Sequence, residues 1–548
     1  MYIRQITRKN KDGSKVTYVQ LAHNARDPEK GFAVAKVLYN FGRREDLDIN
    51  QLQRLVKSIS RFLKPEDVLD AQISMELSDS DIKWKICKSY GGIHLLAELW
   101  KRFQFKEILS KPISQASYRT PILKAVFAMI ANRCLSPSSK LAVSDWVEKQ
   151  VYIPDLPEID VQVLYRAMDF ILEYQEELEK EIYWSVADIL NLEVDILFFD
   201  TTSTYFETDE ISDLKKRGYS KDKRKDLPQV VVGLAVTRDG IPVKHWVFPG
   251  NTADMDTIER VKNDLAGWRL NRLIFVHDAG MSSEDNHRYL QRGGGHYIVG
   301  RKLKSGEKEA RAALSERGPY TQLNDKLFAK QIILGEGEKR KRLVLVKNLE
   351  EEQRQRIVRH QILETVEEKI ERLNNRRDRS HSKEVCELKS HSVYGKYVKE
   401  LGDGRLKVMK TKAARESRYD GKFLIETSDD TLSLEDVVFG YKQLYDVEHA
   451  FRSLKTTLKL RPNYHSRDDR IRCHIFLCFL SLLLVRIVEN KTEKTWSAVR
   501  DEMNRIYFGE FNQNGSTIRL LTEFTKEQRS ILKKLDIKEP STVVDIQP

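Results

Sequence analysis

Cysteine is scarce in this sequence, and its arrangement excludes several classes of protein. The chain has 548 residues and five cysteines, none of which forms a CxxC pair or a zinc-ligand spacing. Without a disulfide framework or a zinc module, reduced thiols in a cytoplasmic protein are expected. The five are Cys87, Cys134, Cys386, Cys473 and Cys478.

Long hydrophobic runs are lacking as well. The first ten residues, MYIRQITRKN, contain no apolar core of the kind a signal peptide requires, so no signal peptide is expected. The most apolar run, 475–485, has eleven residues, whereas a membrane-spanning helix needs about 20. We interpret this run as a buried helix and expect no membrane partner.

Charge, by contrast, is abundant and unevenly distributed. The net charge is +12, and residues 301–420 hold 31 Lys and Arg against 20 Asp and Glu, so nearly all of the surplus lies there. A charged segment is usually a solvated face. A surplus confined to one insertion beside an acidic site nevertheless favours a phosphate-binding surface, because neutralised phosphates supply most non-specific DNA affinity.

A chain of this length should divide into several domains, and the N-terminal third shows two patterns. Residues 1–86 are expected to form a small β-sheet plus a helix, and residues 87–190 a helical region that binds DNA ends. Short turns between helices suit a DNA-binding module, but they suit a plain helical bundle equally well. The signals in the first region are strand-like runs at 2–8, 15–21 and 32–41, an Asp12-Gly13 hairpin turn and a helical pattern at 49–63.

From residue 191 to 301 the periodicity changes to that of strands. Three antiparallel strands, a helix and a further strand are the order expected of an RNase H-like α/β core. In that fold Asp200 and Asp278 would lie at adjacent strand ends. The strand-like runs are 194–199, 229–237, 241–248, 272–277 and 295–301, with a helical pattern at 254–268.

Residues 302–420 interrupt this core as a basic, β-rich insertion, and residues 421–548 complete it. The second part of the core should contain a strand at 422–427, a helix that carries a glutamate, and a helical C-terminus from about residue 465. The overall fold class expected is therefore α/β. In the insertion, strands are expected at 327–334, 342–346 and 407–410, and a charged helix at 350–374.

The stretch 441–455, YKQLYDVEHAFRSLK, predicts a helix with a polar and an apolar face. Tyr441, Glu448 and Lys455 are seven residues apart and would share one face, and Arg452 would lie one turn from Glu448. An ordinary amphipathic surface helix with a Glu448–Arg452 ion pair is the alternative. The expected apolar stripe is Val447, Phe451, Leu454 and Leu458.

Asp200, Asp278 and Glu448 together suggest a metal site. A lone aspartate after a strand is more often a turn or capping residue, but three carboxylates on rigid supports suit Mg²⁺ or Mn²⁺. Two ions about 3.5–4 Å apart can activate a water or a 3′-hydroxyl for displacement at phosphorus. Arg452 and Lys455 would hold the phosphates.

These segments resemble the DDE transposases of bacterial insertion sequences, in the group with a β-rich insertion before the catalytic glutamate. The resemblance implies that Asp200, Asp278 and Glu448 are the catalytic, metal-binding triad. The segments that carry it are DTTSTYFE around Asp200, PGN at 249–251, HDAG around Asp278, and YDGKFLIET followed by YKQLYDVEHAFRSLK, with NRCLSPSSKL and LYRAMDF upstream.

The same resemblance implies that Tyr441 and Lys455 contact the DNA phosphate backbone near the cut. The arginine of the family's Tyr-Arg-Glu-Lys signature falls at Leu444, and Arg452 is the candidate substitute. The insertion also lacks the tryptophan with which relatives that cut through a DNA hairpin stack an unstacked base. The possible stand-ins are Tyr320, Phe328, Tyr394, Tyr397 and Tyr419.

The function expected is that of a transposase that binds inverted-repeat ends and catalyses DNA strand cleavage and strand transfer with two metal ions. Its partners would be double-stranded DNA and, on that DNA, a second copy of the chain; it would be cytoplasmic and associated with the nucleoid. A different RNase H-like nuclease or recombinase, or a DNA-binding protein without catalysis, remains an alternative.

Overall fold

The computed structural model describes residues 1–547 with internal gaps. The gaps are 11–14, 27–32, 63–82, 116–120, 193–195, 267, 269–273, 282, 293–294, 304–307, 337–339, 376–380 and 514–515. The predicted Asp12-Gly13 turn lies outside the described residues. The chain divides into two compact units, one of Met1–Cys87, Tyr507–Glu523 and Pro540–Pro548 and one of Lys88–Ile506 and Phe524–Glu539, and each is described by itself.

The first unit contains the small N-terminal sheet that the sequence predicts. Strands β1 (Tyr2–Lys9), β2 (Lys15–Arg26) and β3 (Ala33–Arg43) form an antiparallel sheet in the order β1-β2-β3. Helix α1 (Ile49–Ser60) begins at Asp48, whose side chain accepts hydrogen bonds from the first backbone N–H groups of the helix.

Three strands near the C-terminus were not predicted. Strands β16 (Tyr507–Gln513), β17 (Ser516–Leu521) and β18 (Val543–Gln547) join β4 (Lys83–Ser89) in a sheet of the order β18-β17-β16-β4. The C-terminal part of the chain is therefore helical only in part.

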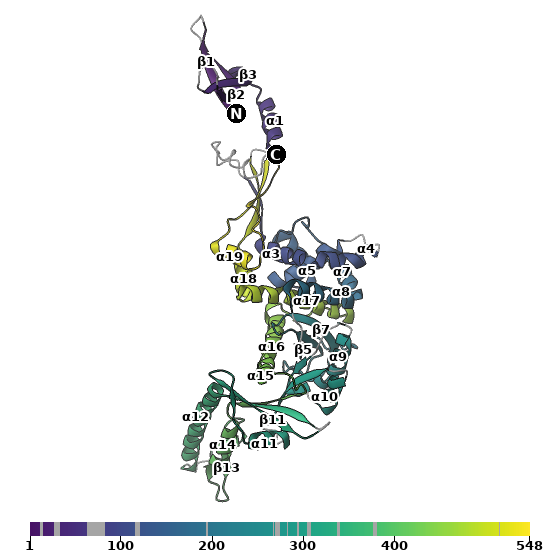
Figure 1. Ribbon diagram of the computed structural model, residues 1–548, viewed down its shortest axis with the longest axis vertical. Coiled ribbons are helices and arrows are strands. Elements are labelled where there is room, and N and C mark those ends of the chain that lie inside the picture. The colour runs from purple at the N-terminus through teal and green to yellow at the C-terminus, as the bar shows by residue number, and fades with distance from the viewer. Residues whose placement is uncertain are drawn as a thin grey trace. The chain divides into compact units, whose positions relative to one another are not determined.

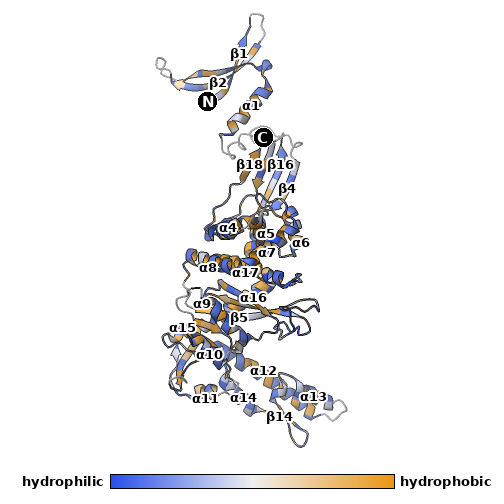
Figure 2. Ribbon diagram, turned by 90° about the vertical axis from the view of Figure 1, so that its right-hand side faces the viewer, coloured by the Kyte–Doolittle hydropathy of each residue, from blue (hydrophilic) through white to orange (hydrophobic). Residues whose placement is uncertain are grey.

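A layer of helices begins the second unit. Helix α17 (Asp468–Thr492) packs against α5, α7 and strand β7. Its middle is hydrophobic and its two ends are hydrophilic (Figure 2). Among the described helices it is the one long and apolar enough to cross a membrane, and 94% of its most apolar window is buried inside the protein. The expectation of a buried helix at 475–485 is confirmed. The other helices of the layer are α3 (Gly91–Arg102), α4 (Phe105–Gln115), α5 (Ile122–Leu135), α6 (Lys140–Lys149), α7 (Val161–Glu173), α8 (Gln175–Leu190), α18 (Trp496–Met503) and α19 (Lys526–Lys534).

The α/β core has the strand order predicted for an RNase H-like fold. Strands β5, β6 and β7 are antiparallel, β8 runs parallel to β5, and β9 runs parallel to β8, in the spatial order β7-β6-β5-β8-β9. Their bounds are β5 (Ile196–Tyr205), β6 (Gln229–Val236), β7 (Pro242–Pro249), β8 (Ile274–His277) and β9 (His296–Arg301), and α9 (Ile258–Ala266) and α10 (Glu284–Gln291) precede and follow β8.

Helices cover both faces of this sheet (Figure 1). On one face, side chains such as Leu197, Phe199 and Phe275 form a buried core with α8, α9 and α10. On the other face, α15 (Leu434–Lys442) packs on β8 and β9, and α16 (Leu444–Arg452) packs on β5 and β6. Alternate residues of each strand therefore point towards α15 and α16.

The insertion extends the sheet rather than forming a separate β-domain. Strand β15 (Lys422–Thr427) pairs with β9, and β12 (Lys341–Asn348), β11 (Leu327–Leu334) and β10 (Thr321–Gln322) continue from it. Helix α11 (Lys308–Ser315) covers one face of this extension. Helix α12 (Leu349–Asn374) confirms the charged helix expected at 350–374. The remainder contains two helices that were not predicted, α13 (His381–Ser390) and α14 (Lys410–Glu416), and a two-stranded sheet of β13 (Val398–Glu400) and β14 (Leu406–Val408).

Candidate active site

Asp200 lies in the middle of β5 and not at its end, so the predicted strand boundary was wrong. The strand continues through Thr201, Thr202, Ser203 and Thr204 to Tyr205, and these residues pair with β6 down to Gln229. Threonine and tyrosine are favourable strand residues, which explains why the strand does not end at the carboxylate. Residues before and after Asp200 pair with β6, and this pairing fixes the position of its backbone.

Asp278 follows β8 directly, beside Asp200. Strands β5 and β8 are parallel, with Phe198 opposite Val276, and two further residues along each strand bring Asp200 and Asp278 to equivalent positions. Since neighbouring strands are about 4.8 Å apart, the two backbones are adjacent. By alternation both side chains belong to the face that α15 and α16 cover.

Glu448 lies on α16, but the helix predicted for 441–455 is broken into three pieces. Helix α15 ends at Lys442, α16 spans Leu444–Arg452, and Ser453–Thr457 form a π-helical turn. The seven-residue spacing therefore does not place Tyr441, Glu448 and Lys455 on one helix face, because it assumes an unbroken helix. The predicted apolar stripe is nevertheless buried: Val447, Phe451, Leu454 and Leu458.

Tyr441 lies within reach of the charges of both Asp278 and Glu448. Burial, together with the negative charges of Asp278 and Glu448, raises the pKa of the Tyr441 phenol to about 12. The phenol oxygen also lies against the backbone of β9, since a Cβ atom added at Gly300 would be 2.1 Å from it. Tyr441 is thus held between the two carboxylates and the sheet.

The close approach of Tyr441 to Gly300 gives a test of this placement. Gly300→Ala should displace the phenol and lower the rate of DNA cleavage by about tenfold, a change equivalent to about 1.4 kcal/mol. Gly318→Ala is the matched control, because no atom lies within 4 Å of an added Cβ there. A rate for Gly300→Ala equal to that of the control would show that the position of Tyr441 does not matter.

The Asp200 side chain belongs to a second set of contacts that the sequence did not predict. The Lys221 ammonium lies 3.5 Å from Asp200 and 3.4 Å from Asp254. It also donates to the carbonyl oxygen of Thr201 at 2.6 Å, and the Thr201 hydroxyl donates to Asp254. Burial raises the pKa of Asp200 to about 6; Lys221 opposes that rise, and Asp254 adds to it.

Lys455 belongs to this second set and does not extend freely into the site. Its ammonium donates to Asp222 at 3.0 Å, and Arg461 pairs with the same carboxylate at 2.8 Å. Burial lowers the pKa of Lys455, and Asp222 opposes that shift. Arg452, in contrast, is exposed and makes no ion pair with any residue that the structure describes.

Lys221, Asp222 and Asp254 were missed by sequence reasoning. Lys221 and Asp222 lie in the charged, aperiodic stretch SKDKRKD, which resembles any solvated loop. Asp254 offered a clearer signal, since it comes three residues after the PGN segment that ends a strand.

The donors present are all of the oxygen type that Mg²⁺ or Mn²⁺ prefers. Asp200 and Asp278 lie on adjacent strands, and Asp278 and Glu448 both act on Tyr441, so the three carboxylates fit such an ion in chemistry. As the side chains are placed, no group of three His, Cys, Asp or Glu residues within the described part of the chain is close enough to hold one ion.

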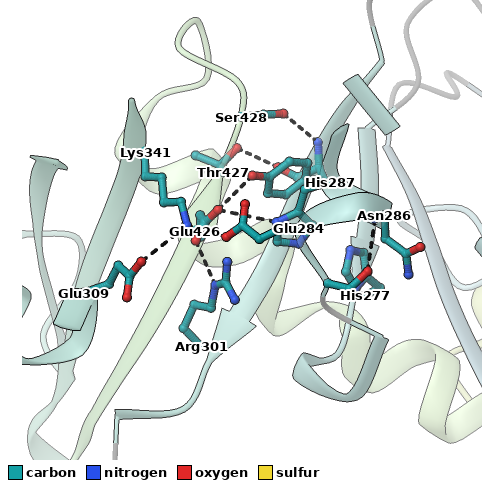
Figure 3. Close-up of polar contacts among 12 residues, drawn as sticks. His277, Glu284, Asn286, His287, Arg301, Glu309, Lys341, Glu426, Thr427 and Ser428 are labelled. Carbon is teal, nitrogen blue, oxygen red and sulfur yellow. Dashed lines mark hydrogen bonds and ion pairs between the residues drawn. The ribbon is translucent and has the colours of Figure 1, made fainter. Parts of the chain in front are cut away.

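His277, between the sheet and α10, is not part of the site. It is fully buried on the face opposite Asp278, where its ring lies 6.1 Å from that of His287, as Figure 3 shows. Burial lowers the pKa of His277 to about 4 and that of His287 to about 3. Both rings are neutral at physiological pH, which agrees with the packing role that strand alternation predicts for His277.

One of the five aromatic residues proposed to stack a base is excluded by its position. Tyr397 is 2% exposed, and its hydroxyl donates to Glu416. Tyr320 and Tyr419 pack against the core under α11, and Tyr394 stacks on His391 with ring centroids 4.2 Å apart. Phe328, Tyr320, Tyr394 and Tyr419 remain only partly buried.

Two protein-family models match this chain. The model of the transposase DDE domain matches residues 195–484, which is 290 of the 548 residues and includes all three carboxylates. The model of the N-terminal domain of IS1634 family transposases matches residues 3–68. No curated protein matches.

Two solved structures are similar to the chain. The piggyBac transposase synaptic complex with hairpin DNA, determined by cryo-EM, has 9% identity and a TM-score of 0.36, over 75% of this chain and 76% of that one. The Mos1 transposase paired-end complex with the left transposon end has 10% identity and a TM-score of 0.14, over 34% of this chain and 60% of that one. At these scores neither likeness carries an argument.

Proposed function

This chain belongs to the transposases with a DDE domain, and from that premise we propose that it cleaves DNA at the inverted-repeat ends of an insertion sequence and joins them to target DNA. Asp200, Asp278 and Glu448 would be the catalytic carboxylates. The observation that carries the proposal is the position of Asp200 and Asp278 on adjacent parallel strands, under the helix that presents Glu448.

The three carboxylates would hold two divalent ions, Mg²⁺ or Mn²⁺, as two-ion sites for phosphoryl transfer do. When bound, such ions supply the activation of a water or 3′-hydroxyl and the stabilisation of the leaving oxygen. The role of the chain is to keep the carboxylates on rigid supports, β5, the end of β8, and α16. Tyr441, between Asp278 and Glu448, would orient the scissile phosphate through its hydroxyl.

Binding of DNA would use the other parts of the chain. The N-terminal sheet and the helical region 87–190 would recognise the inverted repeats, and the basic insertion would neutralise backbone phosphates. Two protomers would pair on the DNA so that both ends are cut in one complex.

An assay of the purified protein tests this function. The substrate is DNA that carries the inverted repeats flanking its gene, with Mg²⁺ present. Strand breaks at the repeat ends, followed by joining of the new 3′ ends to a target plasmid, are expected, and a chelator should abolish both. Breaks without joining would indicate a nuclease, and binding without breaks would indicate a DNA-binding protein; either result contradicts the proposal.

Arg452 and Lys455 should differ in their contribution to DNA binding. Arg452 is exposed and has no ion pair among the described residues. Arg452→Ala should therefore weaken DNA binding, and it should lower the slope of log affinity against log salt concentration by about one phosphate contact. Lys455→Met should change that slope less, because Asp222 already neutralises the ammonium. Titration of a fluorescent DNA at several salt concentrations measures both, and equal slopes for the two variants would contradict the difference.

A further inference from the structure

We propose that a buried basic pocket beside the catalytic helix binds a phosphate group of the DNA backbone. The pocket has a volume of about 550 Å³ and lies between the α5–α6 turn and the segment 459–465. This inference rests on the proposed function for the identity of the ligand but not for the chemistry of the site. It concerns residues outside the carboxylate site described above.

The cations of this pocket are buried without a carboxylate to neutralise them. Lys140 and Arg133 are each only 4% exposed, and among the described residues neither makes an ion pair. The nearby acid Asp169 is engaged by Arg470 at 3.6 Å. A buried ammonium without a counter-charge is costly, so a site that retains one is suited to an anionic ligand.

Arg133 is fixed in place by the protein backbone, which leaves Lys140 as the charge that is free to bind. The Arg133 guanidinium donates to the carbonyl oxygens of Leu458 and Lys459, at 3.3 and 3.2 Å, and to that of Ser138, at 2.9 Å. Its Nε has no hydrogen-bond partner within the described part of the chain. Arg133 thus contributes positive charge and holds the pocket walls together.

The mutual effects of the pocket groups confirm that positive charge dominates there. Burial lowers the pKa of Lys140 to about 7, and Arg133 lowers it further. Burial also lowers the pKa of His465 to about 4, with Lys140, Arg470 and Arg133 as additional causes. His465 is therefore neutral at physiological pH. An anion beside Lys140 and Arg133 would offset the repulsion between these two cations.

Two structural features favour a phosphate on a nucleic acid over other anions. The first is the start of α6: the helix begins at Lys140, Ser139 to Leu141 line the pocket, and Ser139 accepts a hydrogen bond from the Ala142 N–H group. Helix N-termini favour phosphate. The second is the pair Tyr165 and Tyr464, which line the same pocket and offer surfaces for sugar or base. Tyr464 is 72% exposed at the mouth.

The pocket is directly linked to the catalytic segment. Its wall at Lys459 begins two residues after the π-helical turn that carries Lys455. Arg461, which lies in the chain between the lining residues Lys459 and Pro462, pairs with Asp222. The phosphate that we propose for this pocket would belong to the same DNA that the carboxylates act on.

The test uses the full-length protein and Lys140→Met, a neutral side chain of similar length. Binding of inorganic phosphate is measured by ³¹P NMR line broadening, at constant ionic strength maintained with chloride. The apparent Kd for phosphate should be at least tenfold higher in Lys140→Met than in the wild-type protein. It should be unchanged in Lys149→Met, which alters an exposed lysine of the same helix. Lys140→Met should also raise the melting temperature without phosphate, since it removes a buried charge, whereas a purely structural lysine would lower it.

A second arm identifies the source of the phosphate. A short DNA oligonucleotide should displace inorganic phosphate from the wild-type protein, and its own affinity should fall in Lys140→Met. If phosphate binds but DNA does not displace it, the pocket binds a free anion and the proposal is overturned. That result would leave the proposed transposase function unchanged. If phosphate does not bind the wild-type protein more tightly than Lys140→Met, the pocket is not an anion site.

Discussion

Glutamine in place of Glu448 is expected to lower the rate of DNA strand cleavage by about a thousandfold or more, since a charged metal ligand contributes several kcal/mol. The fold should not change, because Glu448 is exposed on α16 and its carboxylate makes no hydrogen bond among the described residues. DNA binding should stay within about twofold, a change of less than 0.5 kcal/mol of the size typical for surface substitutions. Gel shift and cleavage assays on one DNA substrate measure the two quantities.

The matched control is Asp446→Asn on the same helix. Asp446 is half-buried and its charge neighbours are Arg486, His449 and Asp239, not the catalytic carboxylates, so cleavage should be nearly normal. Because triad residues act as a unit, the double variant Asp278→Asn with Glu448→Gln should be no slower than either single variant. Normal cleavage by Glu448→Gln would remove the glutamate from the site, and Asp446 and Glu435 would be examined next.

The order of the core strands could be predicted because its signals are local. The apolar runs of β6 and β7 and the Asp239-Gly240 turn between them, where Gly240 has a φ of +69°, specify that hairpin without knowledge of the rest of the chain. The same kind of signal was available for β16 and β17, which flank the dipeptide Asn514-Gly515. The strongly apolar helix that precedes these strands favoured a helical C-terminus instead.

The site itself could be predicted only in part. Carboxylates after apolar runs identified Asp200 and Asp278, but the extent of β5 depends on pairing with β6, which a single segment does not reveal. The heptad spacing of Tyr441, Glu448 and Lys455 assumed regular helix, whereas the chain turns at Gln443 and widens to a π-helical turn after Arg452. The pairing of Lys455 with Asp222 joins residues 233 apart in the chain, so no local pattern could show it.

Glutamine in place of Glu426 is expected to give the largest loss of stability, a decrease of about 3 kcal/mol in the free energy of unfolding. Glu426 is 1% exposed between β9 and β12. Its carboxylate accepts hydrogen bonds from the Tyr297 hydroxyl and from Arg301 Nε, both at 2.8 Å. Figure 3 shows Glu426 beside Arg301. The neutral amide cannot balance the charge of the partly buried Arg301 guanidinium, which loses the carboxylate that it contacts directly.

Urea unfolding followed by tryptophan fluorescence measures the change, because Trp246 and Trp268 lie in the core of the same sheet. Glu309→Gln is the control: it removes an acid from the same network, but its side chain is 37% exposed and pairs with Lys341 at 3.4 Å, so the loss should be below about 0.5 kcal/mol. A comparable loss in both variants would mean that burial of Glu426 contributes nothing. A large loss in Glu426→Gln alone would show that the junction between the core sheet and its extension depends on a buried charged group. That group lies on β15, the strand that leads the chain from the insertion to the helix of Glu448.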